Sequence, residues 1–321
     1  MGSRAQTAGR DPAQRPAPTF AINGTAFAAP RIAAGLYLVA TPIGNLGDIT
    51  LRALETLAGA DLIACEDTRV TKKLLDRFAI ATQLTPYHDH NAATARPKLL
   101  EKLGSGAAIA LVSDAGTPLI SDPGFKLVRE ASQTGIAVTA LPGASSVLSA
   151  LCVAGLPTDR FFFEGFLPSK AVARRSRIAE LAKIDATLVL FESGARITDT
   201  LADLSAAFGD REAAICREMT KLHEEILRGR LAELSRDADN LETRGEFVVV
   251  IAPPATADAA MTDAELDDAL SAALSSRSVK DAVAEIAAIS GRGKREVYAR
   301  ALELTKLEPT KHAKGRADDG R

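Results

Sequence analysis

The sequence of 321 residues contains no tryptophan, and aromatic residues make up only 4% of it. Hydrophobic cores must therefore be built from Ala, Val, Leu and Ile. The three cysteines, Cys65, Cys152 and Cys216, are widely spaced in apolar or strand-like contexts, which indicates reduced core thiols in a cytoplasmic protein rather than a disulfide framework. No apolar run approaches the roughly 18–20 residues that cross a bilayer, so we expect no membrane partner.

Neither sign of charge is in large excess, because Lys and Arg number 39 and Asp and Glu number 41. The net charge of −2 excludes a globally basic coat for nucleic acid but leaves room for a local basic patch. The glycine-rich turns have neither the GxGxxG spacing of a dinucleotide loop nor the GxxxxGK[ST] pattern of a phosphate loop. A ligand site in this chain is therefore not one of the usual nucleotide sites.

The segment Leu111–Gly124, LVSDAGTPLISDPG, is the most informative stretch that is present. An apolar run, Ile109–Val112, ends in two turns that combine an acid with glycine, Asp114–Gly116 and Asp122–Gly124. A buried strand that ends in such turns exposes backbone N–H and C=O groups at one edge of a sheet. Open α/β sheets bind ligands at that edge, so the pattern predicts a ligand site there.

Strand-like and helix-like segments alternate along most of the chain, with short connections. This pattern predicts parallel or mostly parallel sheets that helices cover on both faces, and therefore an α/β fold. Helix, glycine turn and helix near the C-terminus predict a small helical module. We expect a disordered leader at 1–30, an α/β lobe at 31–155, a second α/β lobe at 156–254, a linker at 255–261, the helical module at 262–308 and a disordered basic tail at 309–321.

Two further strand ends in the first half of the chain carry residues with special backbone requirements. Thr41–Asp48, TPIGNLGD, and Leu141–Ser146, LPGASS, both combine proline and glycine at a strand-to-helix turn. Because the carboxyl ends of parallel strands lie at the same edge of a sheet, we expect these turns to converge with Leu111–Gly124 on one cleft.

A dense polar cluster follows the strand that ends near Cys65. It reads Glu66-Asp67-Thr68-Arg69, with Lys72 and Lys73 close behind. A carboxylate beside a cationic side chain could accept a proton or grip a sugar and a phosphate. A capped helix start with a surface salt bridge would give the same pattern, and the sequence leaves both readings open.

The segment His88-Asp89-His90-Asn91 raises the question of a metal site. Two histidines at i and i+2 do not share a helix face, and no cysteine or carboxylate shows metal-ligand spacing. We therefore expect no metal, and a polar loop at the mouth of the cleft instead. No Ser/His/Asp order and no Cys/His pair indicates a nucleophile system.

The C-terminal part has a different charge balance from the rest of the chain. From Arg277 to Arg321 there are 11 Lys or Arg residues against 7 Asp or Glu residues, a net charge of +4. This local excess favours a nucleic-acid contact. A solvated dimerisation or capping module remains an alternative.

Taken together, these motifs resemble the ribosomal RNA small-subunit methyltransferase I family, a branch of the tetrapyrrole-methylase superfamily. The resemblance rests on LVATPIGNLGDIT, CEDTR, YHDHN, LVSDAGTPLISDPG, ALPGASSVLSAL, FEGFLPSK, REMTKLHEE and GEFVVVI, which follow one another in the family's order between residues 35 and 252. The C-terminal SVKDAV and GRGKREVYARAL look like the helical RNA-binding module at the end of that family.

The resemblance implies a two-lobed tetrapyrrole-methylase-like fold with parallel or mixed sheets, and with S-adenosylmethionine in the cleft between the lobes. It also implies a homodimer and transfer of a methyl group to the ribose 2′-hydroxyl of a cytidine in the decoding region of 16S rRNA. Two alternatives stay open. One is a methylase that acts on a tetrapyrrole ring carbon, and the other is a non-catalytic RNA-binding factor of ribosome assembly.

Three sets of site residues follow from the motifs. As catalytic residues we expect Glu66 or Asp67 as the proton acceptor, with Arg69 stabilising charge. The expected cofactor-binding residues, by motif position, are Pro42, Ser113, Asp114, Ala115, Ser121, Pro142, Gly143, Ala144, Ser145, Phe191 and Met219. The expected RNA-binding residues are Lys72, Lys73, His88, Asn91, Lys170, Arg292, Lys294 and Arg295.

One stretch departs from the family pattern. Where the family shows an aromatic-Glu-Ser/Ala-Pro-His-Arg type of sequence, this chain has Phe191-Glu192-Ser193-Gly194-Ala195-Arg196. Glu192 and Arg196 fit the pattern, but Gly194-Ala195 stands in place of Pro-His. No role of that histidine carries over to this chain.

Overall fold

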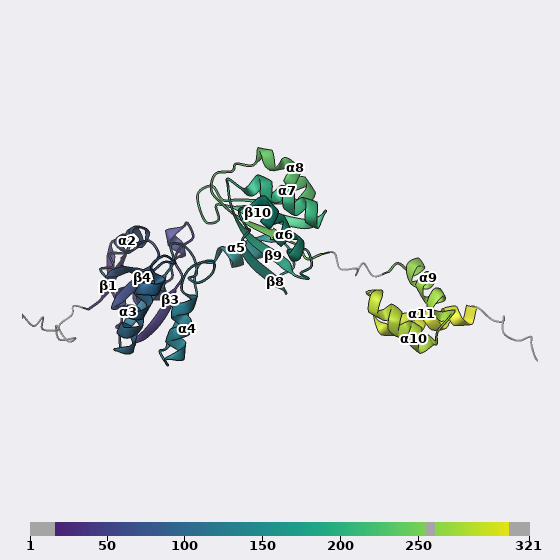
Figure 1. Cartoon of the computed structure of the whole chain (residues 1–321), viewed down its shortest axis with the longest axis horizontal. Helices are drawn as coiled ribbons and strands as arrows, with labels where there is room; N and C mark the ends of the chain where they lie inside the picture. The colour runs from purple at the N-terminus through teal and green to yellow at the C-terminus, as the bar shows by residue number, and fades with distance from the viewer. Residues whose placement is uncertain (1–16, 255–260, 308–321) are drawn as a thin grey trace, which may run out of the picture. The chain divides into compact units, whose positions relative to one another are not determined.

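The computed structural model describes residues 17–254 and 261–307. The chain divides into two compact units, residues 1–252 and residues 253–321, and each is described by itself (Figure 1). The first unit contains two α/β lobes and the second contains three helices. The expected α/β fold with a C-terminal helical module is confirmed.

The first lobe is built on a five-stranded sheet in which all neighbouring strands are parallel. Separate hydrophobic clusters cover its two faces, one under α1 and α2 and the other under α3 and α4. The strand order is β5 (Leu84–Pro86), β4 (Leu62–Cys65), β6 (Ala108–Val112), β3 (Gly35–Val39) and β7 (Val138–Leu141). The helices are α1 (Leu51–Gly59), α2 (Thr68–Arg77), α3 (Ala92–Gly104) and α4 (Phe125–Gln133).

A β-hairpin precedes this lobe, in a region that we expected to be part of a disordered leader. Its strands are β1 (Thr19–Ile22) and β2 (Thr25–Ala28). Phe20 is buried in the core of the first lobe and stacks on Phe27. The expectation of disorder is therefore wrong for residues 19–28. The signal that could have found the hairpin is Asn23-Gly24, whose positive φ angles suit a tight hairpin turn. The remaining leader, residues 1–16, lies outside the described residues.

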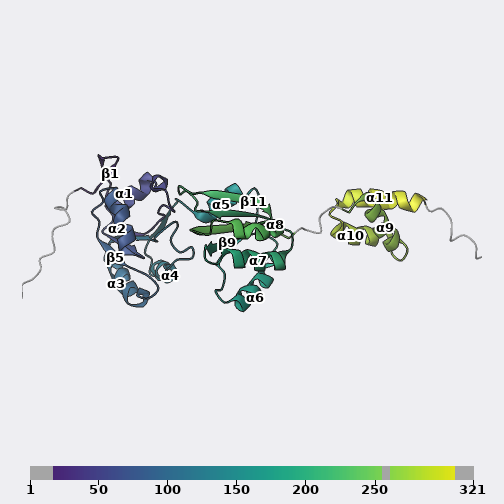
Figure 2. The same ribbon diagram turned by 90° about the horizontal axis from the view of Figure 1, so that it is seen from above.

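The second lobe has a mixed five-stranded sheet. Its helices α6 (Ala171–Leu181), α7 (Ile197–Phe208) and α8 (Leu231–Arg236) pack on one face, and α5 (Ser146–Ala154) packs on the other (Figure 2). The strand order is β11 (Glu225–Arg230), β10 (Glu212–Arg217), β12 (Glu246–Ile251), β9 (Thr187–Ser193) and β8 (Phe161–Phe166). Only the β8–β9 pair is parallel.

Helix α5 belongs by its packing to the second lobe, although the expected boundary at residue 155 assigned it to the first. Val147, Ala150, Leu151 and Ala154 form its buried face and lie against the second sheet. The small residues of that sheet face, such as Ala214, allow the helix to approach closely. The chain therefore crosses between lobes at the turn before α5, so that residues at the start of this helix can reach the space between the two sheets.

The C-terminal unit consists of α9 (Asp263–Leu274), α10 (Val279–Ile289) and α11 (Lys294–Leu307). Thr262 and Glu265 form a reciprocal capping box at the start of α9. One apolar cluster joins the three helices, formed by Leu266, Leu270, Val283, Ile286, Val297 and Ala301. Linker residues 255–260 and the tail from residue 308 onward lie outside the described residues. Among the described helices, none has both the length and the apolar character that a membrane span requires.

Candidate active site

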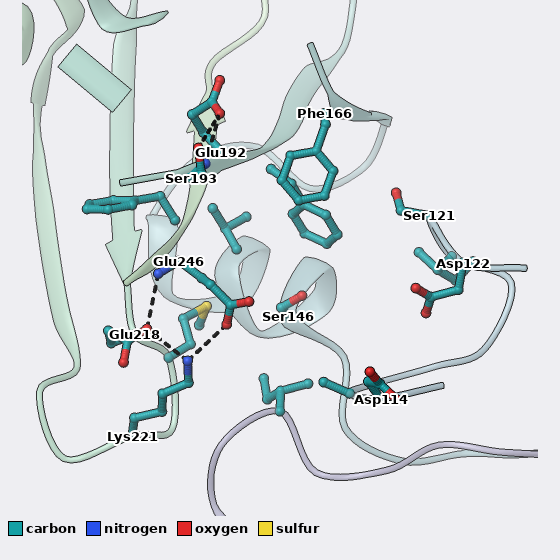
Figure 3. Close-up of a pocket in the computed structure, with 17 residues that line it drawn as sticks. Asp114, Ser121, Asp122, Ser146, Phe166, Glu192, Ser193, Glu218, Lys221 and Glu246 are labelled. Atoms are coloured by element: carbon teal, nitrogen blue, oxygen red, sulfur yellow. Dashed lines mark hydrogen bonds and ion pairs between the residues drawn. The ribbon is translucent and has the colours of Figure 1, made fainter. Parts of the chain in front are cut away.

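A cavity of about 330 Å³ lies between the two lobes of the first unit (Figure 3). The first lobe contributes residues from the loops that follow β3 and β6. The second contributes the start of α5, the ends of β8 and β9, the loop between β10 and β11, and the start of β12. The lining residues are Ile43, Asp114, Ala115, Ile120, Ser121, Asp122, Ser146, Phe166, Phe191, Glu192, Ser193, Glu218, Met219, Lys221, Glu246, Phe247 and Val248.

Backbone hydrogen bonds bring the three predicted turns of the first lobe together. Thr41 and Gly116 exchange two N–H to C=O bonds of 2.9 and 3.0 Å. The Thr117 hydroxyl donates to the Ala144 carbonyl at 3.2 Å, which ties the loop after β6 to the turn before α5. Gly116 has a φ of +77° and a Cβ there would press on Ile43, so glycine is needed at this crossing.

Five of the eleven residues expected to bind the cofactor line the cavity: Asp114, Ala115, Ser121, Phe191 and Met219. The other six do not line it. They are Pro42, Ser113, Pro142, Gly143, Ala144 and Ser145. Several of these shape the turns instead. The Ser145 side chain caps α5 by accepting from the Leu148 N–H, and Gly143 lies so close to Ala40 that a Cβ would clash. Selecting residues by their position in a motif therefore identified residues that build the turns, whereas their neighbours Ile43 and Ser146 line the cavity.

The expected catalytic residues Glu66, Asp67 and Arg69 do not line the cavity. Asp67 caps α2 by accepting from the Arg69 N–H at 2.8 Å, and its carboxylate also pairs with the Arg69 guanidinium at 2.6 Å. These bonds lower the pKa of Asp67 to about 2. The Asp67 N–H donates to the Asp114 carboxylate at 3.0 Å. The structure thus supports the capped helix start, which helps to hold Asp114 at the cavity wall.

Glu66 and Asp122 are the two carboxyl groups of this edge whose pKa is raised. For Glu66 the main cause is burial and the next is the charge of Asp114. Burial also raises the pKa of Asp122, to about 6, and a hydrogen bond with Ser113 opposes part of that rise. The charges of Glu66, Asp114 and Asp89 raise it further. Of the two groups, only Asp122 lines the cavity. The sequence analysis placed it in one of the two acidic turns but did not include it among the expected site residues.

An aromatic wall from the second lobe faces these loops. The ring of Phe191 contacts Phe163 and Phe166 edge-on, with centroid distances of 4.9 and 5.6 Å. Met219 is buried beside it and lines the same cavity. Such a wall suits a flat ring or a thioether-like group. Phe166 lies in the FEGFLPSK motif, at the end of β8, but of that motif only Lys170 was expected to be a site residue.

Charged residues of the second lobe close one end of the cavity. The Lys221 ammonium pairs with Glu218 at 2.8 Å and with Glu246 at 2.9 Å (Figure 3). The neighbouring Thr220 hydroxyl accepts a hydrogen bond of 3.2 Å from the Asn45 N–H of the first lobe. This segment therefore connects the two lobes at the cavity. Glu218, Thr220 and Lys221 belong to the REMTKLHEE motif, but of that motif only Met219 was expected at the site, because the contacts of Lys221 with Glu246 and of Thr220 with Asn45 join residues distant in the chain.

Glu192 is buried in the wall, and its carboxylate is fully engaged. It accepts hydrogen bonds from the Ser193 N–H and the Thr200 hydroxyl, both at 2.8 Å, and an ion pair from Arg196 at 3.3 Å. The next residue, Gly194, donates its N–H to the Gly245 carbonyl at 3.1 Å. A Cβ at Gly194 would overlap the carbonyl oxygen of Thr243. The packing of this loop therefore requires glycine at the position where this chain departs from the family pattern.

The residues expected to contact RNA differ in their surroundings. Lys72 pairs with Asp76, while Lys73 and Lys170 are exposed. His88 and Asn91 form a turn in which the Asn91 side chain accepts from the His88 N–H and donates to the Pro86 carbonyl. Within residues 17–254 and 261–307, no group of three His, Cys, Asp or Glu side chains is arranged to hold a metal ion.

In the C-terminal unit, the Arg292 guanidinium is held by groups of the same unit. It pairs with Asp263 and Glu296 and donates a hydrogen bond to the Met261 carbonyl. Lys294 and Arg295 are exposed at the start of α11.

Each of the two units matches a known protein family. Residues 35–235 match the family model described as Tetrapyrrole (Corrin/Porphyrin) Methylases, and residues 260–305 match the one described as RsmI C-terminal HTH domain. A curated relative from Mesorhizobium japonicum, named ribosomal RNA small subunit methyltransferase I, is 48% identical over 288 residues, 89% of this chain and 95% of the relative. A relative of the same name from Halalkalibacterium halodurans is 51% identical and covers 67% of this chain and 75% of its own.

Solved structures share the fold at low sequence identity. Cobalt precorrin-4 methyltransferase, a cobalamin biosynthetic enzyme, is 18% identical with a TM-score of 0.52, over 68% of this chain and 94% of that one. Diphthine synthase gives the same TM-score and identity, over 68% of this chain and 89% of that one. At this identity the likeness concerns the fold of the two lobes alone.

Proposed function

We propose that this chain, which belongs to the ribosomal RNA small subunit methyltransferase I family, methylates the ribose 2′-hydroxyl of a cytidine in the decoding region of 16S rRNA. The enzyme is a methyltransferase of small-subunit ribosomal RNA, and its methyl donor is S-adenosylmethionine. The choice of a cytidine and of its 2′-hydroxyl rests on the family resemblance alone. The observation that carries the proposal is the cavity between the two lobes.

The residues of the cavity fit that donor. Its volume of about 330 Å³ lies at the lower end of the range for small-molecule sites. Phe166, Phe191 and Met219 offer an apolar wall for an adenine ring. Asp114 places a carboxylate on the opposite wall, which favours a positively charged ligand. When bound, the donor supplies a methyl group on a cationic sulfur.

The chain's own residues then have to position the acceptor and handle its proton. Methyl transfer to oxygen needs an in-line approach, and holding two reactants in line supplies much of the rate. We place Asp114, Ala115, Ser121, Phe191 and Met219 at the donor, since all five line the cavity.

For the RNA we keep the exposed Lys73, Lys170, Lys294 and Arg295 as contacts, and we propose that the enzyme acts as a homodimer in the cytoplasm. Phosphate binding by Lys and Arg is the main source of affinity for nucleic acid. The exposed pair at the start of α11 supports a contact by the C-terminal unit. The homodimer rests on the family resemblance.

One assay tests this function and its alternatives. The full chain is incubated with radiolabelled S-adenosylmethionine and with small ribosomal subunits, naked 16S rRNA or a tetrapyrrole precursor. Label in a cytidine ribose of the rRNA is the expected result. Label in the macrocycle, or binding of rRNA without transfer of label, would contradict the proposal.

A further inference from the structure

The loop between β6 and α4 presents an acidic side chain that the motif analysis did not use. Asp122 lines the cavity together with Asp114 and Ser121, and Figure 3 shows these labelled residues on the right of the view, across the cavity from Glu192 and Glu218. Leu119 and Ser121 have φ angles of +75° and +64°, values that non-glycine residues rarely adopt and that concentrate at functional sites. The residues next to Asp122 thus adopt energetically unfavourable backbone conformations, and these conformations determine where the Asp122 side chain lies.

The other carboxylates that line the cavity are already engaged. Glu192 has three hydrogen bonds and an ion pair, and Glu218 and Glu246 share the ammonium of Lys221. Asp114 accepts from the Asp67 N–H, a bond that links two loops of the first lobe. The oxygens of these carboxylates therefore serve structural contacts, and the hydrogen bond from Lys221 also lowers the pKa of Glu218.

We propose that Asp122 is the proton acceptor for the substrate hydroxyl, an inference that rests on the proposed function. The geometry that supports it is the position of Asp122 on the cavity wall, where Glu66 and Asp67 do not reach.

The electrostatic surroundings of Asp122 suit this role. Glu66, Asp89 and Asp114 face it from the loops after β4, β5 and β6, and Ser113 is its hydrogen-bond partner. Glu192, Glu218, Lys221 and Glu246 line the cavity from the second lobe. Burial and these like charges raise the pKa of Asp122 to about 6. An acid with such a pKa is ionised at neutral pH and is a stronger base than an ordinary aspartate, which is the compromise that general-base catalysis favours.

The step balances in atoms and charge. The ribose oxygen forms a bond to the methyl carbon as the methyl–sulfur bond breaks, and the electron pair of that bond stays on sulfur. The proton of the hydroxyl moves to a carboxylate oxygen of Asp122. The positive charge on sulfur and the negative charge on Asp122 are both lost, and the products are a methyl ether, a neutral thioether and a protonated Asp122.

The test compares Asp122→Asn with the wild type and with Asp210→Asn, a matched change at an exposed aspartate between α7 and β10. Single-turnover methyl transfer to small subunits is measured from pH 5 to 9, together with equilibrium binding of S-adenosylmethionine and of rRNA. We expect Asp122→Asn to lower the rate by about 10²- to 10⁴-fold, the usual contribution of a general base, with both affinities close to wild type. The acid limb of the wild-type profile should disappear with it, whereas Asp210→Asn should keep that limb.

Two further measurements keep the inference falsifiable if Asp122→Asn is unstable. Carbon-detected NMR of the donor-free wild-type chain should show Asp122 titrating near pH 6. Ser113→Ala removes the hydroxyl that lowers the pKa of Asp122, so it should move both this titration and the acid limb to higher pH.

Wild-type rate and pH profile in Asp122→Asn would overturn the inference. So would a rate loss that a matching loss of donor affinity accounts for, since Asp122 would then be a binding residue. A wild-type enzyme that transfers no methyl group to ribose would refute the proposed function itself, and the two failures are therefore distinguishable.

Discussion

Gly194→Ala is the substitution whose consequence follows most directly from the structure. A Cβ at this position would overlap the carbonyl oxygen of Thr243 and would lie 3.3 Å from that of Gly245. Both obstacles are backbone atoms, so no side-chain rotation can relieve the contact. The Gly194 N–H also donates to Gly245, which prevents the two segments from separating without the loss of that bond.

The magnitude can be estimated from these contacts. Overpacking of a well-packed site costs typically about 1–3 kcal/mol, and we expect the upper end, about 3 kcal/mol, because backbone has to move. For a unit of this size each kcal/mol lowers the midpoint of thermal unfolding by roughly 2–4 °C, which gives a decrease of about 6–12 °C. Since Glu192 and Ser193 line the cavity, donor affinity should fall as well.

Thermal unfolding followed by circular dichroism or calorimetry checks the prediction, and Gly104→Ala is its control. Gly104 is the last residue of α3, and a Cβ there would meet no other heavy atom within 4 Å. Alanine at such a helical position should stabilise the protein by about 0.4–1 kcal/mol. The two substitutions are chemically identical and should move the midpoint in opposite directions. A Gly194→Ala protein that unfolds within 1 °C of wild type would refute the close approach to Thr243.

Three other outcomes follow from the structure. Phe191→Leu keeps an apolar wall but loses the ring, so calorimetric titration should show donor affinity reduced by about 3- to 10-fold. Asp67→Asn removes a carboxylate whose pKa is lowered to about 2 in the folded protein. The stability that this carboxylate adds to the fold is present above its unfolded-state pKa and is lost as the pH falls toward 2. Denaturant melts of the variant should therefore depend less on pH between 4 and 2 than those of the wild type. Changing both Lys294 and Arg295 to Gln should weaken rRNA binding and reduce its salt dependence by about two phosphate contacts, whereas Arg292→Gln should mainly lower the stability of the C-terminal unit.

Each of these outcomes has a result that would contradict it. Unchanged donor affinity in Phe191→Leu would remove the aromatic wall from the donor site. An acid-unfolding profile of Asp67→Asn that matches wild type would mean that the bond with Arg69 does not persist in solution. An unchanged salt slope in the double variant would show that the exposed start of α11 does not contact RNA.

The sequence predicted the parts of the fold that depend on local pattern. Alternation of strands and helices predicted the parallel sheet of the first lobe, and the proline- and glycine-rich turns predicted which strand ends converge. Strand β11 was not predicted, since an edge strand with charged residues at Glu225 and Arg230 lacks a clear apolar alternation. The packing of α5 on the second sheet also depends on contacts with residues distant in the chain.

The site was less predictable than the fold, for a physical reason. Motif residues with special backbone requirements, such as Gly143 and Ser145, shape the turns and leave the cavity wall to their neighbours. The pairing of Lys221 with Glu246, and the contact of Gly194 with Thr243, join segments of the chain that only the folded structure brings together. The surroundings that raise the pKa of Asp122 come from three different loops and carry no signal in any one of them.

Hydrogen–deuterium exchange of the full chain, with and without S-adenosylmethionine, tests most directly whether the two lobes share one donor site. Slower exchange in residues 113–124 of the first lobe and in residues 218–224 of the second, at the same donor concentration, is the predicted result. Protection confined to one lobe, or absent from both segments at a donor concentration that saturates binding, would contradict a shared site.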